Sequence, residues 1–189
     1  MKKDDQFYRD MQRYIAVTTV GPSALRNQGS KGVIKAAQKY LTEVELSAFR
    51  SRNEDNFLTT LDAQTEQLRK VLPHGAQNWG AARKALNLFL RDICYNRFLC
   101  ERYGLTRSEE WMEIPLDSLV ATALKRKAGR GALPRWPGLN QLKVDVSTRF
   151  QAFARELAAS QGISRVHLDM RLWTDEREGN GEPGSRAYR

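Results

Sequence analysis

The chain has 189 residues, of which 41% are hydrophobic, and a formal net charge of +9 from 31 Lys and Arg against 22 Asp and Glu. This length is typical of one domain and the hydrophobic content can fill its core, so one compact unit is expected. The positive charge indicates an anionic partner, with nucleic acid as the first candidate and a membrane surface or simple solubility as alternatives.

Cysteine usage and the N-terminus argue against several further classes. Cys94 and Cys100 form no CxxC motif and no Cys/His cluster, which argues against structural zinc. On one helix they would point in different directions, so we expect no disulfide and a reducing compartment. The N-terminal MKKDDQFYRDMQRY holds no apolar run long enough for a signal peptide or a membrane span. We expect a cytoplasmic monomer with no metal or other cofactor and no membrane partner.

Helical spacing of apolar residues dominates the first half of the chain. It predicts a helix around residues 7–15, after which the Gly-, Pro- and Ser-rich segment 21–32 predicts a loop. Helical spacing returns in 33–44 and in 57–71. A turn rich in Gly and Asn then precedes one long helix, which is expected to end near Gly104.

The second half alternates helices with irregular segments. Pro115 precedes a short helix, DSLVATALKR, for which Asp117 or Ser118 can act as N-cap. After the basic loop RKAGRGALPRWPG, helical spacing resumes at 142–157. The C-terminal residues are polar and rich in Gly, so we expect 176–189 to be a disordered tail.

The last regular stretch, RVHLDMRLW, fits two secondary structures. Its strict alternation is typical of a half-buried strand, but no convincing partner strands exist elsewhere, so a helix with Ser164 as N-cap is favoured. Both readings place Asp169 and Trp173 on one face, and the helix adds Val166 and Met170 to it. Two interpretations stay open. Either Trp173 packs into the core while Asp169 caps a neighbouring backbone, or the carboxylate lies beside an aromatic platform.

The apolar stripe of the predicted long helix leaves Lys84 on the opposite side, together with Leu88, Arg91 and Tyr95. That face is either a solvated surface or the wall of a cleft that receives an anionic group. Asp117 follows in the constrained turn IPLDSLV, after the chain has reversed. The lysine and the aspartate can therefore converge.

Three short motifs carry a resemblance to a known family: ARKALNLFL, EIPLDSLV and VHLDMRLW. The chain resembles the helix-hairpin-helix DNA glycosylases over residues 10–174, and in particular the archaeal-type 8-oxoguanine DNA glycosylases. The resemblance implies an all-α fold, a two-lobed helical bundle that forms a single domain over 1–175 with a cleft between its lobes.

At matching positions, the resemblance implies a double-stranded DNA substrate with a modified base and assigns chemistry to four residues. Lys84 would be the nucleophile on C1′ of the deoxyribose, forming a Schiff base if the enzyme is also a lyase. Asp117 would stabilise the cationic sugar and help deprotonate the lysine. Asp169 and Trp173 would line the base pocket, where the indole stacks on the base and the carboxylate fixes the lysine or the base edge. The base must first leave the stacked duplex.

Other positions match the family less closely. In GPSALRNQG, Gln28 or Asn27 would read the base, and a plain Gly/Asn turn is the alternative. The segment HGAQNWGAARK departs from the hairpin pattern G-x-G-x-[KR]. Its backbone amides at 75–81, with Gly80, and the side chain of Arg83 are candidate contacts to the DNA backbone.

Arg126 and Arg130, in the basic segment KRKAGRGALPRW, are further candidates for phosphate contact, and a solvated loop is the alternative. Leu88 and Arg91 join the predicted base pocket, at positions where the archaeal enzymes tend to have an aromatic residue and a lysine. This departure leaves two kinds of substrate open. One is oxidised guanine, as in DNA repair, and the other is a bulkier base such as a hypermodified cytosine of viral DNA, as in antiviral defence.

Two other classes of function are compared with this hypothesis. The same helices and charge are typical of a non-catalytic DNA-binding protein, in which Lys84 would contact phosphate. A nuclease is disfavoured because the sequence has no compact set of metal-binding carboxylates, and Glu109, Glu110 and Glu113 are interpreted as exposed charges. The sequence therefore predicts a DNA N-glycosylase, with or without lyase activity.

Overall fold

The computed structural model describes residues 3–25, 27–29 and 31–179, and within these ranges the chain is all-α, without a β-strand. The predicted fold class is confirmed at this level. Short 3-10 helices, labelled η, separate several of the α-helices. The elements in chain order are α1 (Lys3–Thr19), α2 (Val33–Glu43), η1 (Leu46–Phe49), α3 (Glu54–Val71), α4 (Trp79–Tyr95), α5 (Arg97–Tyr103), η2 (Thr106–Trp111), α6 (Ser118–Ala128), η3 (Leu139–Gln141), α7 (Val144–Ser160), η4 (Arg165–His167) and α8 (Leu168–Gly179).

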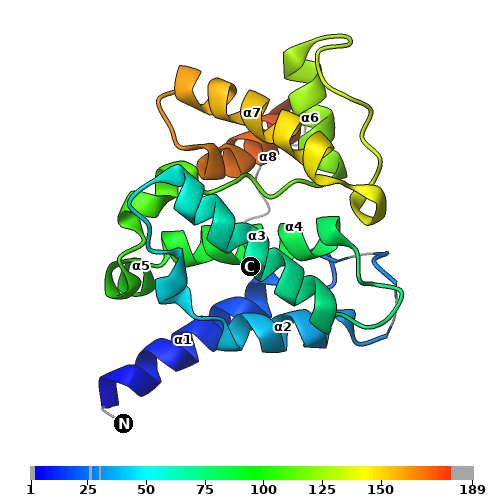
Figure 1. Cartoon of the computed structure of the whole chain (residues 1–189). Coiled ribbons are helices and arrows are strands. Elements are labelled where there is room, and N and C mark those ends of the chain that lie inside the picture. Colours follow the sequence, from blue (N-terminus) through cyan, green and yellow to red (C-terminus); the bar gives the residue numbers. More distant parts are fainter. Residues whose placement is uncertain (1–2, 26, 30, 180–189) are drawn as a thin grey trace, which may run out of the picture.

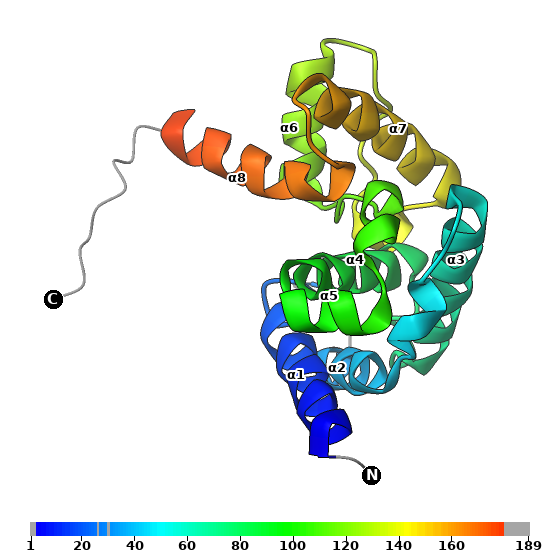
Figure 2. The same ribbon diagram turned by 90° about the vertical axis from the view of Figure 1, so that its left-hand side faces the viewer.

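The buried hydrophobic side chains form two clusters. One lies among α1 to α5 and also includes Val166, whereas the other lies among α6, α7 and α8. We call these groups of helices the N-terminal lobe and the C-terminal lobe. Figure 1 shows α6, α7 and α8 at the top, with α4 beneath them and α1 and α2 at the bottom. Figure 2 shows that α8 extends away from α6 and α7.

The segment 112–116, which we call the strap, carries the chain from the N-terminal lobe to the C-terminal lobe. Its residues are buried throughout. Met112 belongs to the first hydrophobic cluster and Ile114 to the second, so the strap passes between the two cores. It ends directly before Asp117, the N-cap of α6. The position of Asp117 therefore depends on how the strap is held.

Helix α4 is the centre of the molecule, and its first half is buried on every side. Asn78 begins the helix, because its side chain accepts a hydrogen bond from the Ala81 amide at 2.8 Å. Small residues follow and allow close packing: a Cβ added at Gly80 would lie 2.2 Å from the carbonyl oxygen of Leu139 in η3. A helix enclosed in this way can direct side chains into both lobes.

The predicted long helix is wrong in one respect, because the structure divides it into α4 and α5 at Asn96. Asn96 is extended, with φ −89° and ψ 101°, and its side chain accepts a hydrogen bond from the Leu99 amide at 3.0 Å. The local cap competes with continuation of the helix. The predicted end is confirmed, since Gly104 closes α5 in the left-handed region at φ 67°.

The stretch RVHLDMRLW is helical, as η4 followed by α8, so the helix interpretation is confirmed. Its buried side was not predicted, however, because Leu168 and Leu172 enter the core while Met170 and Trp173 are 48% and 52% exposed. Ser164 does not cap the helix with its side chain, which instead donates to Glu109 at 3.1 Å. Helix α8 continues to Gly179, into the segment expected to be disordered, and residues 180–189 lie outside the described residues.

Candidate active site

A cavity of about 810 Å³ is lined by residues of both lobes. Its walls come from the end of α1 and the loop after it, from α4, from the start of α6, from the loop that contains η3, and from α8. Among the residues predicted for the site, those that line the cavity are Asn27, Gln28, Lys84, Leu88, Arg91, Asp117, Asp169 and Trp173. The structure thus brings together in one cavity residues that the sequence spreads over the whole chain.

Lys84 and Asp117, which both line the cavity, form an ion pair. The Lys84 Nζ lies 3.1 Å from the Asp117 Oδ2, and the two side chains are 8% and 27% exposed. Asp117 Oδ1 accepts hydrogen bonds from the amides of Leu119 and Val120, each at 3.0 Å, as the N-cap of α6. The cap uses one carboxylate oxygen and presents the other to the lysine. The predicted convergence of Lys84 and Asp117 is a feature of the structure.

Arg91 and Asp169 form a second ion pair in the cavity wall. Arg91 Nε also donates to Asp92 Oδ1 at 2.8 Å, and Asp92 Oδ2 accepts a hydrogen bond from Thr19 Oγ1 at 2.5 Å. This network joins α1, α4 and α8. It fixes the orientation of the guanidinium, because carboxylates hold it from two sides.

Asp169 binds its proton more readily than an ordinary aspartate. Burial raises the pKa of Asp169, and the neighbouring Arg91 opposes this rise only in part. The charges of Asp117 and Lys84 also act on this pKa, in opposite directions, so the four side chains form one electrostatic group. A carboxyl group in such a setting can hold or accept a proton near the lysine.

Two indoles line the cavity, and only one was predicted. Trp173 lies on α8 with half of its surface exposed, so the interpretation in which it packs into the core is wrong. Trp136, which sequence reasoning missed, packs edge-on against Phe150 with ring centroids 5.6 Å apart and an interplanar angle of 85°. The only signal for Trp136 was an aromatic residue within the basic loop. Either indole offers a flat surface for a planar ligand.

The loop after α1 makes a local turn at the cavity wall, and base reading by its residues stays a prediction. Asn27 has φ 59°, in the left-handed region that Asn adopts in turns, and it also lines the cavity. Gln28 is 9% exposed and lines the cavity as well. A local turn therefore brings both amide side chains to the cavity wall.

At the start of α4, the structure contradicts the predicted DNA contact of the Arg83 side chain. Arg83 is 5% exposed and its guanidinium donates to Glu113 and Asp62, so it is not available to a phosphate. Gly80 is buried against Leu139 and serves close packing. Within 75–81, the amides of Ala76, Asn78 and Ala81 donate to acceptors in the same region of the chain. Contact of DNA with the other amides of this segment stays a prediction.

Arg126 and Arg130 are exposed near the end of α6 and in the loop that follows. They do not belong to the cavity lining. Their contact with phosphate stays a prediction.

The interpretation of the three glutamates as exposed charges is wrong for Glu113. Glu113 is 7% exposed and accepts hydrogen bonds from Arg83 and Asn87. Glu109 is partly buried and accepts a hydrogen bond from His167 Nε2 at 2.8 Å, whereas Glu110 is exposed. No local sequence pattern predicted the burial of Glu113, because its partners Arg83 and Asn87 lie on α4 and only tertiary packing brings them to it.

The arrangement supports chemistry on a group with an electrophilic carbon. An amine in a recess can attack such a carbon, and the adjacent carboxylate can accept the proton that the amine releases. Within the described part of the chain, no group of three or more His, Cys, Asp and Glu side chains is placed to hold a metal ion. In the same part of the chain, no helix has the length and apolar character needed to cross a membrane. No protein-family model, curated protein or solved structure matches the chain.

Proposed function

We propose that this protein is a DNA glycosylase of the helix-hairpin-helix type, which flips a modified base of double-stranded DNA into the cavity and excises it. The observation that carries the proposal is the ion pair of Lys84 and Asp117, 3.1 Å apart in the wall of a cavity of about 810 Å³. The net charge of +9 favours association with DNA. Flipping is required because the glycosidic carbon is shielded in the stacked duplex.

The proposed reaction uses the lysine as nucleophile. Asp117 accepts a proton from Lys84, and the neutral amine forms a bond to C1′ while the bond from C1′ to the base breaks. The base leaves with the electron pair of that bond and takes up the proton that Asp117 received from Lys84. Asp117 lies close enough to stabilise the positive charge that develops on the sugar. Opening of the sugar ring then gives an imine on Lys84, from which strand cleavage follows if the enzyme is also a lyase.

The remaining lining residues form the proposed base pocket. Trp173 stacks on the flipped base, while Asp169, Arg91 and the amides of Asn27 and Gln28 contact its polar edge. The volume of about 810 Å³ falls in the range of pockets that hold ligands larger than a single base. Leu88 in the cavity wall takes up less of the cavity than an aromatic side chain at the same position would. These features favour a bulky base such as a hypermodified cytosine of viral DNA, with oxidised guanine as the other candidate.

The test is excision from a panel of duplexes that carry 8-oxoguanine, uracil, alkylated purines or glucosylated cytosine. We expect abasic sites from at least one duplex and none with Lys84→Gln. Lys35→Gln is the matched control, because Lys35 lies exposed on α2 and should leave excision intact. Borohydride should trap a covalent adduct that requires Lys84 if an imine forms, whereas abasic sites without trapping indicate a monofunctional enzyme. Tight DNA binding without excision of any base would contradict the proposal in favour of a non-catalytic DNA-binding protein.

A further inference from the structure

We propose that Glu113 is a positioning residue, whose buried ion pair with Arg83 sets the distance between Lys84 and Asp117. This inference rests on the proposed function. It concerns a site outside the cavity lining, at the junction of the two lobes, where side chains from α3 and α4 meet the strap.

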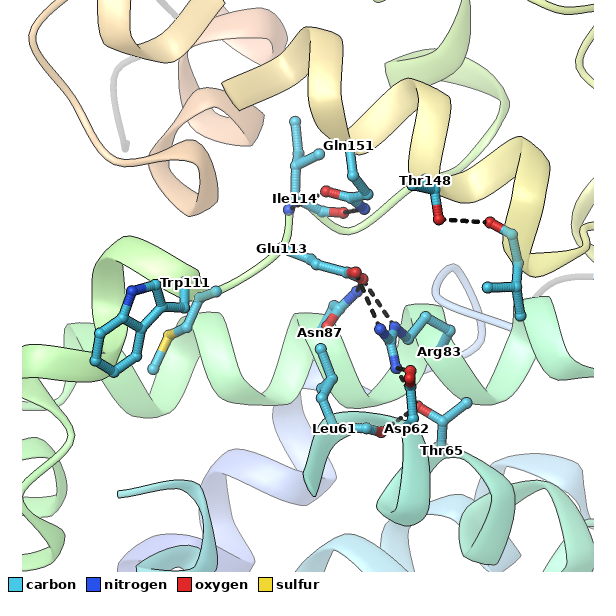
Figure 3. Close-up of polar contacts among 12 residues, drawn as sticks. Leu61, Asp62, Thr65, Arg83, Asn87, Trp111, Glu113, Ile114, Thr148 and Gln151 are labelled. Atoms are coloured by element: carbon cyan, nitrogen blue, oxygen red, sulfur yellow. Dashed lines mark hydrogen bonds and ion pairs between the residues drawn. The ribbon is translucent and has the colours of Figure 1, made fainter. Parts of the chain in front are cut away.

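Figure 3 shows Arg83 extending from α4 to Glu113 in the strap, with Asn87 beside it. Arg83 Nε and its terminal nitrogen donate to the two carboxylate oxygens of Glu113 at 2.8 and 3.0 Å. Asn87 Nδ2 donates to the same carboxylate at 2.9 Å. The third side of Arg83 reaches α3, at Asp62 Oδ1 and Thr65 Oγ1, at 2.8 and 3.0 Å. Both charged side chains are less than a tenth exposed.

This junction is connected directly to the proposed catalytic pair. Arg83 precedes Lys84 on α4, and Glu113 lies four residues before Asp117. The strap between them has little freedom, because Gln151 of α7 bonds both the amide and the carbonyl of Ile114, at 3.1 and 2.8 Å. A shift of Glu113 along α4 would therefore be transmitted to Asp117.

The strap is also held at its beginning by a side chain of η4. Arg165 of η4 donates to the carbonyl oxygens of Trp111 and Met112, at 2.9 and 3.2 Å. Burial lowers the pKa of Arg165 to about 10, so it remains a cation at neutral pH. Hydrogen bonds thus fix the carbonyls of Trp111 and Met112 before Glu113, and the amide and carbonyl of Ile114 after it. The carboxylate of Glu113 then sets the position at which the strap binds α4.

A buried ion pair is a poor source of stability, because the cost of removing two charges from water can exceed their attraction. Apolar residues of similar volume often stabilise such a position as well or better. An apolar contact, however, does not fix the orientation of the two side chains that form it. Two parallel hydrogen bonds from a guanidinium fix a carboxylate within a narrow geometry. This matters next to a reacting pair, where a misplacement of about 1 Å can lower the rate about 100-fold.

The first variant is Glu113→Gln, compared with the wild type in single-turnover excision. We expect the excision rate of bound DNA to fall about tenfold or more, while the dissociation constant for DNA changes less than about twofold. A purely structural residue would instead reduce the amount of active enzyme and leave the rate per active molecule unchanged. A wild-type rate in folded Glu113→Gln overturns the proposal.

The second variant, Arg83→Met/Asn87→Leu/Glu113→Leu, guards against failure of the first to fold. It replaces the polar junction by apolar side chains, and Asp62 can turn to solvent because it is 59% exposed. We expect a folded protein whose excision is still about tenfold slower or more, because the apolar contact does not fix the strap. Excision at the wild-type rate by this variant overturns the proposal. Gln12→Leu is the matched control, since it removes a buried side chain whose hydrogen bonds run to Leu41 and Val44 and not to the strap, and it should keep the wild-type rate.

A readout that does not depend on excision separates this inference from the proposed function. Reductive methylation of Lys84, followed by mass spectrometry, reports how firmly the 8% exposed amine is held against Asp117. We expect faster methylation of Lys84 in Glu113→Gln than in the wild type and an unchanged rate in Gln12→Leu. If the wild type excises no base, the proposed function is wrong. The methylation rate of Lys84 still shows whether Glu113 positions the lysine. An equal rate in the wild type and Glu113→Gln overturns the positioning role.

Discussion

Two adjacent cations on α4 pair with two carboxylates of one short segment, and the two pairs have opposite surroundings. Lys84 and Asp117 face the cavity, where the Asp117 side chain is 27% exposed, whereas Arg83 and Glu113 lie between the lobes and the Glu113 side chain is only 8% exposed. Arginine stays protonated and binds a carboxylate with fixed geometry, but lysine can release a proton and act as a nucleophile. The pair at the cavity, Lys84 and Asp117, is therefore suited to catalysis. The buried pair, Arg83 and Glu113, is suited to holding the strap in position.

The largest expected effect separates the two pairs by activity. Lys84→Gln should lower the single-turnover excision rate by about 10³-fold or more, because it removes the proposed nucleophile. Its free energy of unfolding, measured with urea, should change by no more than about 1 kcal/mol, since Asp117 can be hydrated in the cavity. If Lys84→Gln lost as much stability as an Arg83 variant, the two pairs would not differ in their contribution to stability.

The second prediction separates them by stability. Arg83→Met should lower the free energy of unfolding by about 3–5 kcal/mol, because it leaves the carboxylate of Glu113 buried without its cation. Urea unfolding monitored by circular dichroism measures the change. Asp117→Asn is the comparison, and it should cost about 1 kcal/mol because the neutral amide can still cap α6. Equal losses for the two variants would contradict the comparison.

The third prediction concerns the pH dependence of the stability that the buried pair of Arg83 and Glu113 contributes. Burial alone would raise the pKa of Glu113, but the charge and hydrogen bonds of Arg83 outweigh it and lower this pKa below its ordinary value. The stability that the ionised carboxylate contributes is therefore complete above the unfolded pKa of about 4.3 and is lost as the pH falls through the folded pKa.

Urea unfolding between about pH 6 and pH 3 should thus show a smaller loss of stability on acidification in Glu113→Gln than in the wild type. Gln12→Leu removes no charge and should keep the wild-type dependence on pH. The same dependence in all three proteins would show that the ionisation of Glu113 is not linked to folding.

The smallest effect concerns cations on the surface. Replacing Arg126 and Arg130 by Ser should change the free energy of unfolding by no more than about 0.5 kcal/mol, because both are exposed. If they bind phosphate, DNA binding should weaken for every sequence alike, and the slope of log K against log salt should fall by about 1 for each contact. An unchanged slope would exclude these arginines from the DNA interface.

Much of the fold could be predicted because its signals are local. Apolar spacing and turn residues located the helices, Asp117 was one of two N-caps considered, and Gly104 was expected to close a helix. Where the local signals compete, prediction failed: Asn96 divides the predicted long helix because its side chain caps α5. On α8 the alternation of apolar and polar residues did not show which side is buried. The structure shows that Trp173 is exposed, whereas Leu168 and Leu172 are buried.

By itself, the sequence determined which residues belong to one helical face. It placed Lys84 away from the apolar stripe of α4, and it placed Asp169 and Trp173 together. Only the tertiary structure decided what each face meets. It turned Arg83 inward to Glu113 and Lys84 toward the cavity, and it brought Trp136 to the same wall. The physical reason is that helical periodicity fixes the direction of a side chain about its own axis, whereas burial and charge pairing depend on which segments pack around that axis.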